Sequence, residues 1–265
     1  MGDQTTAIHR VFSVEHNGAL RDKQPPHCAP WPLGVALRWL FGSAVVSIAV
    51  TIGCIAGVEY LASLYSMHAS HRELVFAVTL SSYALHNALV VAFIVYKLHR
   101  TRRPLEDLWG AVALRPSHIA LGVAAGAVLM GMQAALHEFT AGETASSSAY
   151  DLRLDGRLVL ILELLINAVL IGSAEEMLFR GVVFRALLNT LSDGWAIVLS
   201  AGLFALFHFD YAASLSAALY ITAFGTVAAY LFLHTRSLNT CIALHITCNA
   251  IERLVHYAPH MQLFQ

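Results

Sequence analysis

Charged residues are scarce in this 265-residue chain: Asp, Glu, Lys and Arg make up 12% of it, against about 25% in soluble domains. Hydrophobic residues make up 57%, and the mean hydropathy is +0.63. So little polar surface cannot cover a soluble core, and the composition therefore predicts an integral membrane protein embedded in a lipid bilayer. The formal net charge of −1 gives no excess of positive charge that would favour nucleic acid as a partner.

Closely spaced cysteine pairs and a recognisable secretion signal are lacking too. The chain has four cysteines, none of them in a CxxC pair: Cys28, Cys54, Cys241 and Cys248. This pattern gives no reason to expect a disulfide framework or a cysteine-based zinc site. Residues 1–32 are polar and mixed and contain no apolar segment of the kind found in signal peptides. We expect residues 1–34 to form a polar N-terminal tail in the cytoplasm.

Long apolar stretches, by contrast, fill most of the remaining sequence. A membrane-spanning helix needs about 20 predominantly apolar residues. Seven candidate stretches lie near residues 39–61, 74–96, 117–136, 158–184, 195–209, 212–233 and 238–257. We therefore predict an all-α fold, a polytopic membrane helix bundle of about seven transmembrane helices, with six to eight as the range.

The distribution of Lys and Arg predicts the orientation of this bundle, because cytoplasmic loops carry an excess of both. With the N-terminus inside, the cytoplasmic side holds twelve of these residues: Arg10, Arg21, Lys23, Arg38, Lys97, Arg100, Arg102, Arg103, Arg115, Arg180, Arg185 and Arg236. The other side holds four: Arg72, Arg153, Arg157 and Arg253. We therefore expect a cytoplasmic N-terminus, and the size and the lack of organellar signals suit a bacterial inner membrane.

Three ionisable side chains, Glu175, Glu176 and Arg180, lie within the apolar stretch 158–184. A charged side chain near the bilayer centre costs about 2.5–3.5 kcal/mol on insertion scales, and its default explanation is a functional site. Glu176 and Arg180 are i and i+4 on a helix and can form an ion pair. Glu175 is rotated about 100° from Glu176 and has no partner on its own helix, which makes it a candidate general base. The alternative is a structural salt bridge at the membrane interface.

Two more polar clusters interrupt the apolar C-terminal half. His208 ends the stretch 195–209, and His245 and Asn249 are i and i+4 on the stretch 238–257. If these helices pack against the Glu175 helix, one pocket combines a carboxylate, two imidazoles and an amide, which suits hydrolysis of an amide bond. The alternatives are an interfacial histidine for His208 and helix–helix hydrogen bonding for His245 with Asn249.

Three other polar residues within apolar stretches have weaker interpretations. Glu163 and Asn167 form another i,i+4 pair. This pair either packs against polar groups of neighbouring helices or forms a wall of the same cavity. We interpret His86, in the stretch 74–96, as a packing residue.

The order of the motifs resembles a known family. Glu175-Glu176 followed by Arg180, then Phe204 followed by His208, then His245 followed by Asn249 resemble the motifs of the CAAX-processing and bacteriocin-processing (CPBP, or Abi) intramembrane proteases. The resemblance covers about residues 158–257. It implies a CPBP-like catalytic core over residues 151–265, preceded by N-terminal transmembrane helices and loops over residues 35–150, all in one integral membrane domain.

The resemblance also implies a role for each motif residue. Glu175 would activate water with help from His208, and His245 and Asn249 would stabilise the tetrahedral oxyanion. Glu176 and Arg180 would fix the helix and its neighbours. We expect a mechanism that requires no cofactor. Zinc is the alternative, with His208, His245 and Glu175 as ligands.

We therefore predict an intramembrane endopeptidase that uses a glutamate-activated water to hydrolyse a peptide bond of a membrane-associated peptide or protein. The alternative function is a non-catalytic membrane immunity or partner-binding protein on the same fold. A small proton-coupled transporter fits less well, because the sequence has no internal repeat and no matching pair of broken helices.

Overall fold

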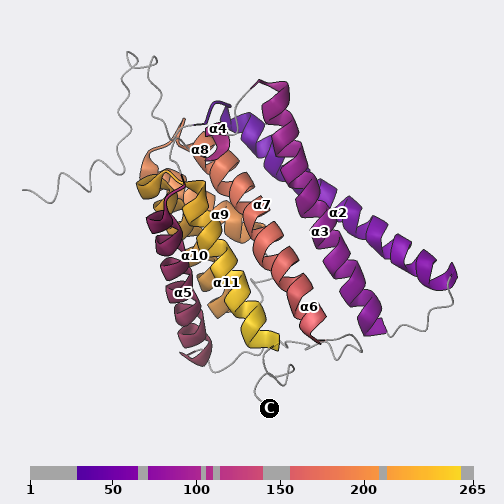
Figure 1. Ribbon diagram of the computed structural model, residues 1–265. Helices are drawn as coiled ribbons and strands as arrows, with labels where there is room; N and C mark the ends of the chain where they lie inside the picture. Colours follow the sequence, from indigo (N-terminus) through magenta and orange to yellow (C-terminus); the bar gives the residue numbers. More distant parts are fainter. Residues whose placement is uncertain are drawn as a thin grey trace, which may run out of the picture.

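The computed structural model describes residues 29–64, 71–102, 106–109, 114–139, 156–208 and 214–257. About 90% of these residues are helical, and no strand occurs among them. A helix lies at each of the seven predicted stretches (Figure 1). Six of them are α2 (Leu33–Leu64), α3 (His71–Arg100), α5 (Pro116–Phe139), α9 (Asp193–Leu206), α10 (Leu215–Thr235) and α11 (Leu238–Tyr257). The seventh is a composite helix between α5 and α9, and the all-α prediction is confirmed.

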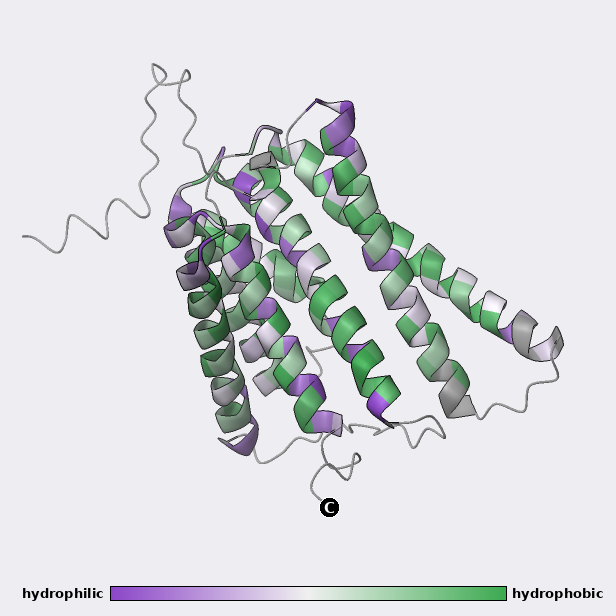
Figure 2. Cartoon of the chain, viewed as in Figure 1, coloured by the Kyte–Doolittle hydropathy of each residue, from purple (hydrophilic) through white to green (hydrophobic). Residues whose placement is uncertain are grey.

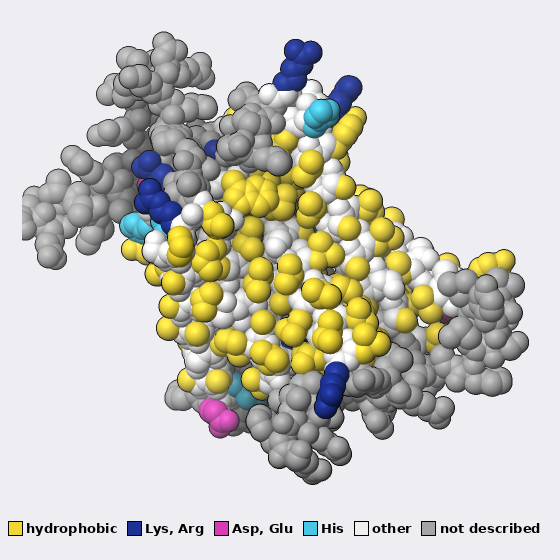
Figure 3. All heavy atoms as spheres, in the orientation of Figure 1, with side chains coloured by type: hydrophobic (Ala, Val, Ile, Leu, Met, Phe, Trp, Pro, Cys, Tyr) yellow, Lys and Arg dark blue, Asp and Glu magenta, His cyan; other side chains and the backbone are white. Residues whose placement is uncertain are grey.

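Five helices are long and apolar enough to cross a membrane by length and composition: Leu33–Tyr60, Phe76–Arg100, Pro116–Glu138, Arg157–Leu187 and Leu215–Thr235. The apolar helix α9 is shorter, and α11 carries more polar residues (Figure 2). Large apolar side chains such as Val45, Ile52 and Val128 are more than 60% exposed. Figure 3 shows apolar side chains over the visible face of the helices, with Lys and Arg near its ends. The chain is therefore an integral membrane protein, as predicted.

The composite helix is built from five consecutive segments: α6 (Gly156–Glu163), the π-helix η1 (Leu164–Ile171), α7 (Gly172–Glu176), the π-helix η2 (Met177–Phe184) and α8 (Arg185–Leu187). Every residue of η2 is buried, including the charged Arg180. π-Helical turns are rare and are frequently found at functional sites. The pair Glu175-Glu176 thus lies between two such turns, on the most enclosed helix of the bundle.

The other helices pack on two sides of this composite helix (Figure 1). On one side α2 packs against η2 and α3 packs against η1 and α7, while α2 and α3 also contact each other. On the other side α11 packs against η1 and α7, and α5 packs against α11 and α10. α9 contacts η2 and α10. This arrangement leaves the carboxylates of α7 between α3 and α11.

Two glycines allow α5 to approach α11 closely. A Cβ atom on Gly122 would lie 2.3 Å from the Thr240 carbonyl oxygen, and one on Gly126 would lie 2.8 Å from the Leu244 carbonyl oxygen. Gly122 and Gly126 are four residues apart, the spacing with which small residues let membrane helices approach. The contact fixes the rotation and depth of α11, the helix that carries His245 and Asn249.

The described residues that precede α2 are anchored to the composite helix. The indole nitrogen of Trp31 donates to the Val182 carbonyl at 3.1 Å, and the amide nitrogen of Asn189 donates to the carbonyl oxygens of Ala29 and Trp31. Only the first 28 residues of the expected N-terminal tail lie outside the described residues.

Candidate active site

A cavity of about 740 Å³ lies among α2, α3, the composite helix, α9, α10 and α11. Glu175, His208, His245 and Asn249 all line this cavity, although they come from three different helical regions. The prediction that the three motifs meet at one pocket is therefore confirmed. The roles of these residues in catalysis are a separate matter and stay a prediction.

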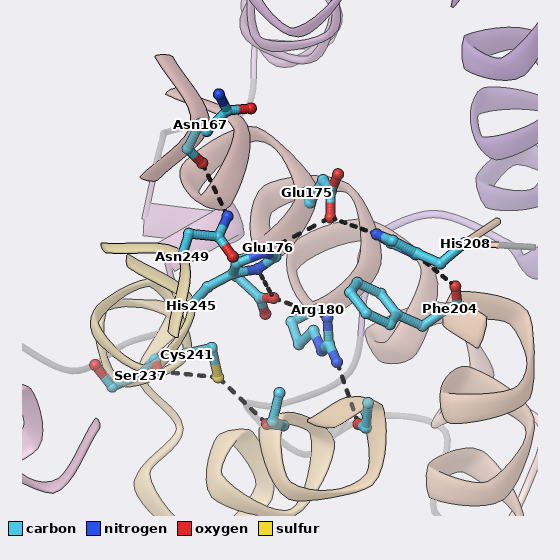
Figure 4. A network of polar contacts seen from close by, with 12 residues as sticks. Asn167, Glu175, Glu176, Arg180, Phe204, His208, Ser237, Cys241, His245 and Asn249 are labelled. Carbon is cyan, nitrogen blue, oxygen red and sulfur yellow. Dashed lines mark hydrogen bonds and ion pairs between the residues drawn. The ribbon is translucent and has the colours of Figure 1, made fainter. Parts of the chain in front are cut away.

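Glu175 lies between two histidines (Figure 4). Its Oε2 atom is 3.3 Å from Nε2 of His208 and 3.8 Å from Nε2 of His245. The side chain of Glu175 is 22% exposed, so it is partly open to the cavity. As expected, no ion pair joins Glu175 to a residue of its own helix among the described residues; α11 and the turn after α9 supply its two partners.

The Phe204 residue of the second motif fixes the orientation of His208. The Nδ1 atom of His208 lies 2.8 Å from the carbonyl oxygen of Phe204, one turn earlier in the chain. A carbonyl oxygen can only accept, so Nδ1 carries the proton in this bond. The Phe204 ring lies 4.3 Å from the imidazole between centroids. Together these contacts direct Nε2 of His208 toward Glu175.

Glu176 joins two helices through one carboxylate oxygen. Its Oε1 atom is 2.8 Å from Nη1 of Arg180 and 2.8 Å from Nδ1 of His245. Glu176 and Arg180 are fully buried, and His245 is 5% exposed. The predicted i,i+4 ion pair between Glu176 and Arg180 is confirmed. The bond to His245 was not predicted, and it turns the Nε2 atom of this histidine toward Glu175.

The buried guanidinium of Arg180 has further partners. Its Nη2 atom donates to the Gly225 carbonyl at 3.2 Å, and its central carbon lies 4.5 Å from the centroid of the Phe204 ring. The Phe224 ring is 5.7 Å away. Carboxylate, carbonyl and aromatic faces therefore surround Arg180, which is how a charge is kept in a low-dielectric interior.

Asn249 lies one helical turn beyond His245 on α11. Its Nδ2 atom donates to the backbone carbonyl of Asn167, in η1, at 2.8 Å. Asn167 in turn donates from its side chain to Glu163, and Nη1 of Arg253 lies 3.8 Å from Glu163. Glu163 and Asn167 also line the cavity. Of the two interpretations of this pair, the cavity wall is the one the structure bears out.

His86 was interpreted as packing, and this interpretation is wrong. His86 lines the same cavity from α3 as Glu175 does from the composite helix. Its Nδ1 atom is buried without a hydrogen-bond partner among the described residues. The sequence contains a signal for this position: Thr79, Tyr83, His86 and Asn87 share one face of a helix.

The histidines and Glu175 are also the predicted zinc ligands. Both Nδ1 atoms already have partners, Phe204 for His208 and Glu176 for His245, a pattern that fits either zinc-bound or catalytic histidines. Within the described part of the chain, no group of three or more His, Cys, Asp or Glu side chains is arranged to hold a metal ion.

The fold and the cavity define a polytopic membrane protein with a buried site of carboxylates and histidines. Comparison with known families identifies it further: residues 157–251 match the family model "Type II CAAX prenyl endopeptidase Rce1-like". Over this segment the chain is similar to that protease family, which confirms the resemblance to CPBP proteases. No curated protein and no solved structure matches the chain.

Proposed function

We propose that the protein is an intramembrane endopeptidase in which Glu175 activates a water molecule for attack on a peptide bond. The observation that carries this proposal is the 3.3 Å contact between Glu175 and His208 at the wall of a cavity inside a membrane protein. Both groups exchange protons readily, and a carboxylate with a histidine beside it is suited to general acid–base catalysis. The protease-family match over residues 157–251 supports the same reaction class.

The proposed reaction starts with Glu175 taking a proton from water while the water oxygen attacks the carbonyl carbon of the scissile bond. The tetrahedral intermediate carries an oxyanion. The proton then passes from Glu175, with His208 as the relay, to the nitrogen of the leaving amine, and the C–N bond breaks. Water and the amide are thus converted to a carboxylic acid and an amine, with no oxidant, reductant or cofactor consumed.

His245 and Asn249 are the proposed donors to the oxyanion. Nδ1 of His245 is engaged by Glu176, so only Nε2 is available to the cavity. When Nε2 carries a proton, His245 can donate to the oxyanion. One amide hydrogen of Asn249 is used by the Asn167 carbonyl, which leaves the second hydrogen for the oxyanion. Preorganised donors of this kind are worth about 10²–10³ in kcat each.

The proposed substrate is a membrane-associated peptide or protein, because the reactive groups lie in a bundle of membrane-spanning helices. We further propose a bacterial inner membrane with the N-terminus in the cytoplasm. Arg100 and Arg102 at the end of α3, Arg115 before α5 and Arg236 after α10 would then be cytoplasmic, in agreement with the positive-inside rule.

The test compares cells that express the wild-type protein with cells that express Glu175→Gln, which keeps the shape of the side chain and removes the base. Mass spectrometry of the membrane proteins would count new chain ends in each. We expect cleavage products in the wild type and none with Glu175→Gln, at equal amounts of inserted protein. Glu138→Gln, at the exposed end of α5, is the matched control and should cleave normally.

The same comparison tests the alternative of a non-catalytic partner-binding protein. If Glu175→Gln yields the same products as the wild type, the proposed catalytic assignment is wrong. If no products arise in the wild type, and Glu175→Gln restores the wild-type phenotype to a strain that lacks the gene, the binding function is favoured instead.

A further inference from the structure

A polar stripe runs along α3 on the face that lines the cavity. We call Thr79, Tyr83, His86 and Asn87 the α3 stripe; all four line the cavity. Their spacing of i, i+4, i+7 and i+8 puts them on one side of the helix. Phe76–Arg100 is otherwise apolar enough to span a membrane, and polar groups within such a span need a reason.

Two serines of the neighbouring helix extend this polar wall. Ser43 and Ser47 are i and i+4 on α2, and both line the cavity. The catalytic side chains stand on the composite helix, α11 and the turn after α9, whereas these residues come from the two N-terminal helices. The cavity thus has a catalytic wall and a second polar wall. The second wall lies outside the segment 157–251 that matches the protease family.

His86 is the member of the α3 stripe whose environment points most directly to a ligand. Asn87 donates to the Tyr83 carbonyl at 3.0 Å, a bond made within α3. Nδ1 of His86 is buried and has no such bond among the described residues, although burying a polar atom is costly unless it is hydrogen-bonded. Since His86 and Glu175 line the same cavity, a partner bound by His86 would share that cavity with the reacting bond.

An extended peptide is the ligand whose chemistry fits this wall. A peptide segment must leave its helix to be cut, and its N–H and C=O groups then need new partners, because lipid supplies none. In the proposed mechanism, the residues of the catalytic wall bind only the carbonyl group of the scissile bond, so they provide no partners for the neighbouring peptide groups. Hydroxyl, imidazole and amide side chains can donate to and accept from the neighbouring peptide groups.

We propose that the α3 stripe is the subsite that binds the extended backbone of the substrate, with His86 hydrogen-bonded to the peptide group next to the scissile bond. This inference rests on the proposed endopeptidase function and assigns substrate binding to the N-terminal helices. His86 is a substrate-binding residue here, and its imidazole takes no part in water activation.

The experiment uses the full-length protein in liposomes. Its probe is a quenched fluorescent peptide that copies a cleavage junction found in the membrane proteins of wild-type cells. kcat and KM are measured for the wild type, His86→Phe and His86→Gln. His99, exposed near the end of the same helix, provides the matched control His99→Phe. Size-exclusion profiles in detergent show whether each variant is folded.

We expect His86→Phe to raise KM about 10- to 100-fold with kcat near the wild-type value, as when a hydrogen bond that serves ground and transition state alike is lost. His86→Gln should stay within about threefold of the wild type in KM, because an amide also donates and accepts. His99→Phe should match the wild type. If His86→Phe misfolds, His86→Ala takes its place. The KM of His86→Ala is then compared with the KM of His86→Gln, and the same difference is expected.

Two results would overturn the inference. One is a wild-type KM for His86→Phe, which would remove His86 from substrate binding. The other is a fall in kcat at unchanged KM without rescue by Gln, which would make His86 part of the chemical step. Failure of the endopeptidase function itself is a separate result: Glu175→Gln would cleave the same peptide at the wild-type rate, whatever the His86 variants do.

Discussion

His245 and Glu176 are joined by a hydrogen bond of 2.8 Å between Nδ1 and Oε1, although 69 residues separate them in the chain. The same oxygen accepts from Arg180. The second glutamate of the pair therefore does more than neutralise a buried arginine. It sets the rotation of the His245 ring and leaves Nε2 facing Glu175, so that the two adjacent glutamates act on the site in different ways.

This bond predicts a strong effect of Glu176→Gln on catalysis. The amide keeps the size of the side chain but removes the charge that holds His245 in its orientation. By analogy with carboxylates that orient catalytic histidines, we expect kcat to fall by about 10²- to 10⁴-fold. The measurement is peptide cleavage in liposomes, with the melting temperature in detergent as a check on folding. A Glu176→Gln enzyme with wild-type kcat would show that the bond has no catalytic consequence.

Arg180→Met separates the structural role of this network from its catalytic role. Without the guanidinium, Glu176 is buried with His245 as its remaining partner, and breaking a buried pair on one side costs about 3–5 kcal/mol. Glu176→Gln keeps an oxygen that can accept from Arg180, whose bond to the Gly225 carbonyl also remains, so we expect Arg180→Met to lower the melting temperature more than Glu176→Gln does. Equal melting temperatures for the two variants would contradict this assignment.

The packing of α5 on α11 gives a prediction with a control on the same helix. A Cβ on Gly122 would lie 2.3 Å from the Thr240 carbonyl oxygen, whereas nothing lies within 4 Å of one on Gly131. Gly122→Ala must push α11 away and should destabilise the protein by about 1–3 kcal/mol. Gly131→Ala should be neutral or stabilising by up to about 1 kcal/mol, since Ala favours helix. Thermal unfolding in detergent measures both, and similar values for the two would argue against the close approach.

The sequence was informative wherever two interacting residues share a helix. Glu176 and Arg180 are one turn apart, so helix geometry alone predicts their ion pair. The helices themselves were also predictable, because apolar stretches of membrane length leave few alternatives. The three motifs could be expected to converge only through the family resemblance, because spacing within one helix does not determine how different helices pack.

Contacts between helices were the part that could not be predicted. The partners of Glu175 depend on the rotation of α11 and on the turn that ends α9, both fixed by tertiary packing. The π-helical turns η1 and η2 have no marker in the sequence that separates them from α-helix. His86 was missed for a related reason: its polar neighbours on α3 mark one face of the helix, but the sequence does not tell whether that face lines a cavity or packs against another helix.

The metal question leads to a chelation prediction. We expect purified protein to contain far less than one zinc per chain, and 1,10-phenanthroline to leave peptide cleavage unchanged, because Glu175 with His208 can activate water without an ion. The non-chelating isomer 1,7-phenanthroline is the control for direct inhibition. Stoichiometric zinc, with loss of cleavage on removal and recovery on re-addition, would show that His208, His245 and Glu175 are zinc ligands after all.

His208→Gln tests whether the contact with Glu175 serves proton transfer. The Gln side chain can still hydrogen-bond to Glu175, but it cannot accept and release a proton near neutral pH. General acid–base groups contribute about 10²–10⁴-fold, so we expect kcat to fall by that factor while KM changes little. His234→Gln, at an exposed position near the end of α10, is the matched control and should leave both constants unchanged. If His208→Gln kept the wild-type kcat, His208 would only position Glu175, and the proton would have to reach the leaving amine from Glu175 directly.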